Sequence, residues 1–247
     1  MRHATRSAVG ILPFACVLCA LPAIGGSAPP AADGAAPALA RMAVPLSPAI
    51  AGDAPAFVVD LHEVPDSPAA AAWAAQAQAL CTQWYPLVCR FLATEGVAQP
   101  KQVTLAFAAE QAAPGATAGT TIRISVPWIL AHPDDFGMVI HELAHVVQAY
   151  PQSANTPGWL VEGIADWVRW WKYEPESPRT PIDRAHASYR DGYRTSAAFL
   201  AWASARYDRR LPQMLDRALR TGTYSDALWE QATGKGLDAL WAEFVAQ

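Results

Sequence analysis

Three short segments in the first half of the chain have the residue pattern of β-strands, namely 57–61, 103–107 and 121–126. The last two alternate apolar and polar positions, as half-buried strands do. Between the first two, the alanine-rich stretch 69–93 places large apolar side chains at helical spacing, which predicts a helix with one buried face. A glycine-containing turn at 114–115 precedes the third strand.

From residue 134 onward the apolar spacing is helical to the end of the chain. Helices are predicted over about 134–150, 157 to beyond 171, 191–207, 211–221, 225–233 and 236–246. Asp134 or Asp135 can cap the first of these helices, and Gly222 and Gly234 are stop signals for two later ones. Strands first and helices afterwards predict an α+β fold.

The first 28 residues have the pattern of an export signal: a positive head, an apolar stretch from 8 to about 24, and then small residues. Two prolines interrupt the apolar stretch, which is also short for a membrane span, so a cleaved signal is favoured over a retained anchor. After its removal we expect no stable membrane span. Residues 29–52 are rich in alanine and proline and predict a linker, which leaves 53–247 as the folded domain.

Composition narrows the possible partners. A hydrophobic fraction of 52% and a charged fraction of 16% exclude a disordered chain. The net charge of −4, without any basic run, gives no reason to expect a nucleic acid or an anionic membrane. The ten tryptophans lie mostly at helical spacing beside aliphatic residues, which favours a role in the core over carbohydrate stacking. The oligomeric state is left open.

Cys81 and Cys89 are the two cysteines beyond the export signal. A pair in an exported protein suggests a disulfide. Eight residues along one helix would separate the two Cα atoms by about 12 Å, which is too far to bridge. Pro86 lies between them and could break the helix, so a disulfide and two buried thiols both remain possible.

The segment His141-Glu142-Leu143-Ala144-His145 carries the main chemical signal. Residues four apart lie on the same face of a helix, so both imidazoles can bind one catalytic zinc ion. Glu142 adjoins the first ligand and can deprotonate a metal-bound water. Two core histidines satisfied by hydrogen bonds are the structural alternative, but that interpretation does not account for Glu142.

A catalytic zinc usually has a third protein ligand and one position for water. The metzincin pattern would need glycine and histidine where this chain has Gln148 and Pro151, so that pattern is excluded. Glu162, among apolar neighbours 17 positions after His145, is the better candidate. Asp166, one turn further on the same face, can accept a hydrogen bond from a ligand histidine. The reverse assignment, with Asp166 as ligand and Glu162 in support, stays open.

Two blocks, 141–148 and 157–169, resemble the basic secretory protein family, which consists of peptidases of the gluzincin type. The similarity extends from about residue 55 to the C-terminus. The resemblance implies a zincin-like fold, with a small N-terminal sheet, an active-site helix below it and a helical C-terminal lobe.

The resemblance also implies one zinc ion held by His141, His145 and Glu162, with Glu142 as general base. The chain is acidic, unlike the family's name, so partners that depend on basic charge are not implied.

A gluzincin mechanism needs a donor for the oxyanion. Tyr193 is the candidate, and the alternatives are Tyr189, Tyr173 and His186; Tyr193 could also simply pack with its hydroxyl satisfied. The strand 121–126, if it lies at the sheet edge, could hold an extended peptide by strand addition, or it could be a covered edge without a ligand.

The sequence therefore predicts an exported zinc metallopeptidase that acts on a peptide or protein substrate. A zinc-binding secreted protein without turnover is the competing hypothesis, and Glu142 argues against it because a structural zinc site needs no base. Hydrolysis of a non-peptide amide is a third possibility.

Overall fold

The computed structural model describes residues 54–92, 96–151 and 155–247. The predicted export signal and linker lie outside the described residues. The start of the folded domain at residue 53 therefore stays a prediction.

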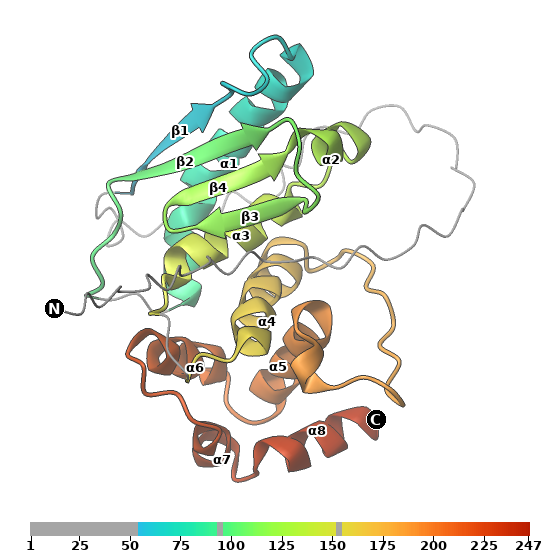
Figure 1. Cartoon of the computed structure of the whole chain (residues 1–247). Coiled ribbons are helices and arrows are strands. Elements are labelled where there is room, and N and C mark those ends of the chain that lie inside the picture. Colours follow the sequence, from blue (N-terminus) through green and yellow to red (C-terminus); the bar gives the residue numbers. More distant parts are fainter. Residues whose placement is uncertain (1–53, 93–95, 152–154) are drawn as a thin grey trace, which may run out of the picture.

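A four-stranded mixed sheet forms the N-terminal part of the described chain (Figure 1). Its strands, in spatial order, are β1 (Ala56–Asp60), β2 (Gln102–Ala108), β4 (Thr121–Ser125) and β3 (Gly115–Ala118). The first three are parallel, and β3 runs antiparallel to β4. The three predicted strands are confirmed. β3 occupies the place where the sequence predicts only a turn, because its Gly-Ala-Thr-Ala residues lack the bulky apolar alternation of a strand.

Two long helices, α1 (Pro68–Phe91) and α3 (Gly137–Gln148), pack against this sheet and against each other. α1 continues through Pro86, so it holds Cys81 and Cys89 apart along one helix. Cys81 is buried, and the Sγ atom of half-buried Cys89 lies 3.7 Å from Gln99 Oε1. The structure thus has two thiols here and not the disulfide.

A short helix, α2 (Val126–Ala131), follows β4 directly and was not predicted. Ser125 Oγ accepts a hydrogen bond from Trp128 N and caps this helix, which therefore begins at Val126, the last residue of the predicted strand. Asp135 precedes α3 and accepts a hydrogen bond from the first-turn amide of Met138, although it is not the residue that immediately precedes the helix. α3 ends where Ala149 adopts a left-handed conformation with φ of 39°.

The rest of the chain is helical, as predicted. Its helices are α4 (Gly158–Val168), α5 (Tyr193–Arg206), α6 (Leu211–Arg220), α7 (Ala227–Thr233) and α8 (Leu237–Val245). α4 continues into a π-helical turn over Arg169–Tyr173, and a 3-10 turn over Tyr189–Asp191 precedes α5. α4 packs against both α5 and α3, so α3 lies between the sheet and the C-terminal helices (Figure 1). The α+β class is confirmed.

The tryptophans belong to the core, as expected. All ten are buried or half-buried, and within the described residues the large apolar side chains that stand exposed are Val58 and Leu130. An exposed tryptophan platform for carbohydrate is thus absent from the described part of the chain. No helix in the described ranges is both long enough and apolar enough to cross a membrane.

Candidate metal centre

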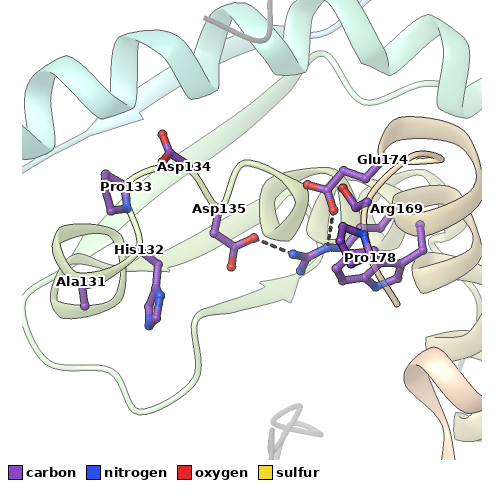
Figure 2. A pocket seen from close by; sticks show the side chains of 10 residues that line it. Ala131, His132, Pro133, Asp134, Asp135, Arg169, Glu174 and Pro178 are labelled. Atoms are coloured by element: carbon purple, nitrogen blue, oxygen red, sulfur yellow. Dashed lines mark hydrogen bonds and ion pairs between the residues drawn. The ribbon is translucent and has the colours of Figure 1, made fainter. Parts of the chain in front are cut away.

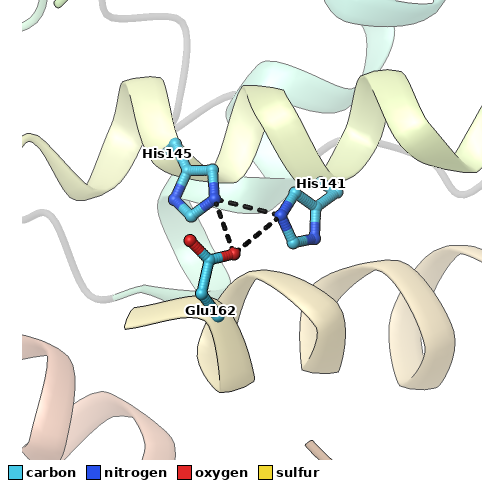
Figure 3. A group of neighbouring side chains, drawn as sticks. All are labelled: His141, His145 and Glu162. Atoms are coloured by element: carbon cyan, nitrogen blue, oxygen red, sulfur yellow. Dashed lines mark hydrogen bonds and ion pairs between the residues drawn. The ribbon is translucent and has the colours of Figure 1, made fainter. Parts of the chain in front are cut away.

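α3 and α4 lie side by side and bring together three side chains that could hold a metal ion (Figure 3). His141 and His145 come from successive turns of α3, and their Nε2 atoms lie 3.0 Å apart. Glu162 comes from α4, and its Oε2 atom lies 3.2 Å from His141 Nε2 and 3.4 Å from His145 Nε2. Three donor atoms from two helices therefore converge on one point.

The spacing of these donors fits a single small cation. Zinc bound tetrahedrally at 2.0–2.2 Å from nitrogen and oxygen ligands separates those ligands from one another by about 3.3 Å. The three observed separations span 3.0 to 3.4 Å. The residues present therefore match the size and the chemistry of the expected metal site.

Asp166 lies on the other side of His141. Its Oδ1 atom is 2.7 Å from His141 Nδ1, and its side chain is buried. A proton on Nδ1 leaves Nε2 with the lone pair that a metal needs. This placement favours Glu162 as the third ligand and Asp166 as the residue that orients His141, which remain predictions.

His145 has a corresponding partner that the sequence analysis did not identify. Its Nδ1 atom lies 2.7 Å from Gln148 Oε1, and Gln148 Nε2 donates to Val161 O over 2.9 Å. Gln148 follows His145 by three positions on α3, so the i,i+3 spacing was visible in the sequence. In the sequence alone, Gln148 serves only to exclude the metzincin pattern.

The electrostatic environment favours a cation. Burial alone would lower the pKa of His141, but hydrogen bonds to Asp166 and Glu162 raise it to about 10. Burial would raise the pKa of Glu162, but its contacts with both histidines hold that pKa well below its usual range. Positive charge on the His141 imidazole is thus stabilised without a metal, and a metal ion would take its place.

Glu142 is nearly inaccessible, with 2% of its surface exposed. Thr117 on β3 donates a hydrogen bond from Oγ1 to Glu142 Oε2 over 2.7 Å. The same Oγ1 atom lies 3.1 Å from the main-chain oxygen of Glu142. A Cβ atom at Gly115 would come within 2.7 Å of Glu142 Cγ, so a glycine is needed where β3 meets α3. β3, which the sequence did not predict as a strand, therefore positions the expected base.

Tyr193, the predicted oxyanion donor, lies beside His141, one of the predicted metal ligands. Its ring lies nearly parallel to that of His141, with centroids 6.2 Å apart. Tyr193 has a φ of 45° and the preceding Gly192 a φ of 78°, so α5 begins in a backbone conformation that is costly for a non-glycine residue. Such strain is typical of functional sites.

The alternative donors make contacts elsewhere. Tyr189 donates its hydroxyl to Asp238, Tyr173 packs its ring against Trp84, and exposed His186 pairs with Asp183. Of the four candidate oxyanion donors, Tyr193 is the one whose ring packs against His141 in the described part of the chain.

The predicted substrate strand needs a correction. The segment 121–126 corresponds to β4, which lies inside the sheet between β2 and β3. β4 therefore cannot accept an added strand. Among the described strands β3 pairs with β4 alone, so β3 is the edge next to the metal centre.

A separate cleft opens at the start of α3 (Figure 2). It is lined by residues 131–135 on one side and by Arg169, Trp170, Glu174, Ser177 and Pro178 on the other. Arg169 bridges it, with Nη2 at 2.6 Å from Asp135 Oδ1 and Nε at 3.5 Å from Glu174 Oε2. The pair with Asp135 links the segment before α3 to the end of α4, whereas the pair with Glu174 is local to the π-helical turn. None of His141, His145 and Glu162 lines the cleft.

Comparison with protein families assigns the chain. A family model described as "Peptidase of plants and bacteria" matches residues 63–244, which is more than half of the chain. The chain belongs to this family. The match confirms the resemblance to the basic secretory proteins and covers every residue of the metal centre. Curated proteins and solved structures gave no match.

Proposed function

We propose that the protein is an exported zinc metallopeptidase that hydrolyses peptide bonds. The observation that carries the proposal is the convergence of His141, His145 and Glu162 beside a buried carboxylate, Glu142. In the described hydrogen bonds the Glu142 carboxylate pairs with Thr117 and with none of these three side chains. Membership of a peptidase family supports a peptide or protein substrate. We also assign a zincin-like architecture, which the order of sheet, α3 and helical lobe supports.

Each residue has one role in this proposal. His141, His145 and Glu162 would hold the zinc, and Asp166 would orient His141. Bound zinc would polarise the scissile carbonyl and lower the pKa of a water molecule. Glu142 takes a proton from the attacking water and later passes it to the leaving amine. Tyr193 donates its hydroxyl proton in a hydrogen bond to the oxyanion.

The edge strand β3 gives the substrate a place to bind. An extended peptide that pairs with β3 would add a strand to the sheet through main-chain hydrogen bonds. Thr117 of β3 contacts Glu142 directly, so a peptide bound along this strand would pass close to the base.

Metal content and casein hydrolysis of the native protein and of Glu142→Ala test the proposal. We expect equal zinc, at one ion per chain, and a loss of hydrolysis by a factor of about 10² to 10⁴ in the variant. Asp183→Asn is the control: Asp183 is an exposed carboxylate 41 positions from Glu142 in the sequence, and its loss should change neither the zinc content nor the hydrolysis. Bound zinc without hydrolysis of a broad peptide library would support the zinc-binding protein without turnover.

A further inference from the structure

The Gln148 side chain lies between His145 on α3 and the main chain of Val161 on α4. The carbonyl oxygen of Val161 can only accept a hydrogen bond, so the Gln148 side-chain atom at 2.9 Å from it must be the NH₂ group. The remaining amide oxygen then faces His145 Nδ1 at 2.7 Å. Because this oxygen can only accept, Nδ1 must carry the proton.

We infer that Gln148 is a positioning residue for the metal: it keeps His145 protonated on Nδ1 and so presents the Nε2 lone pair to the ion. The inference rests on the proposed zinc site. Gln148 is only 2% exposed, so water is not available to replace its amide at His145. Its partner Val161 precedes Glu162, which means that one amide group links the histidine helix to the carboxylate helix.

The two ligand histidines are therefore oriented by different chemistry. His141 donates to a carboxylate, Asp166, whereas His145 donates to a neutral amide. A carboxylate partner makes an imidazole a stronger electron donor, while a neutral amide orients the ring without adding charge. One predicted ligand histidine is thus oriented by a charged side chain and the other by a neutral one.

Zinc release from the full-length native protein, measured by competition with a chelating dye, tests this inference. Gln148→Met keeps the length of the side chain and removes both hydrogen bonds, and we expect zinc affinity to fall about 10- to 100-fold, through faster release. Gln148→Glu retains an acceptor oxygen for Nδ1 and should recover most of the loss.

Gln78→Met is the matched control. Gln78 makes the same kind of bond, from Nε2 to the carbonyl oxygen of Phe57 over 2.6 Å, but it links α1 to β1. The Gln78→Met substitution should leave the rate of zinc release unchanged, even if it lowers the melting temperature. Native release from Gln148→Met would overturn the inference and leave the zinc site standing. A native protein that binds no zinc would instead overturn the proposed function, and this inference with it.

The tautomer can also be read without any variant. Nitrogen NMR of the zinc-loaded native protein should show His145 protonated on Nδ1. A proton on Nε2 would contradict the inference, even if Gln148→Met failed to fold.

Discussion

The sheet half of the molecule, residues 54–151, and the helical half, residues 155–247, contribute different chemistry to the same site. The sheet half supplies both histidines and the buried carboxylate Glu142, which is the proposed base. The helical half supplies Glu162, together with Asp166 and the strained Tyr193. Neither half contains a complete metal centre. In the proposed mechanism, proton transfer would depend on the sheet half, whereas charge balance around the metal would depend on the helical half.

Metal removal should have the largest effect, because it breaks the link between the halves. A ligand that binds only the folded state at a thousand times its Kd stabilises the protein by about 4 kcal/mol. Chelation should therefore abolish peptide hydrolysis and lower the Tm by roughly 10 °C, as measured by calorimetry. Glu162→Ala is the control: without its third donor it should bind zinc poorly, and chelator should barely change its Tm.

Tyr193→Phe tests the helical half's part in catalysis. Loss of one oxyanion donor typically lowers kcat by a factor of about 10² to 10³. The ring that packs on His141 is kept, so zinc content should not change. Steady-state kinetics on a fluorogenic peptide would measure the effect, and a native kcat would mean that Tyr193 only packs.

Asp166→Asn tests the charge contributed by the helical half. Asparagine can still accept a hydrogen bond from His141 Nδ1 but has no negative charge. We expect zinc affinity to fall by a factor of about 10 to 100. Titration with a competing chelator measures this affinity, and an unchanged value would show that Asp166 orients His141 without tuning it.

Thr117→Val tests the sheet half and should have the smallest effect. It removes the hydroxyl that donates to Glu142 while keeping the branched shape of the side chain. A hydrogen bond to a charged group contributes about 1.5 kcal/mol, so kcat should fall about tenfold at unchanged zinc content. Thr117→Ser keeps the hydroxyl and should stay near the native kcat; equal losses in both variants would rule out this role for the hydroxyl.

The sequence predicted the parts of the site that depend on local spacing. The i,i+4 spacing of His141 and His145 follows from helix geometry, and the four-residue step from Glu162 to Asp166 likewise. Thr117 could not be predicted in this way, because it meets Glu142 only through the packing of β3 on α3, across 25 positions in sequence.

The differences between the predicted and the observed fold likewise arise from contacts between segments that lie apart in the sequence. Residues 115–118 form a strand because they pair with β4, not because of their own propensity, so a pattern of Gly, Ala and Thr could not show it. Because β3 pairs with β4, the edge of the sheet lies at β3 and not at 121–126. Pro86 is a potential helix breaker by its residue type, yet α1 continues through it, since packing against the sheet and α3 outweighs one lost hydrogen bond.

Anomalous diffraction at the zinc edge from crystals of the full chain tests the central claim most directly. The account predicts one peak, about 2.0–2.2 Å from His141 Nε2, from His145 Nε2 and from a carboxylate oxygen of Glu162. That result would place the metal between the two halves. A zinc-loaded crystal with no peak at these atoms, or with a peak bound by the sheet half alone, would contradict it.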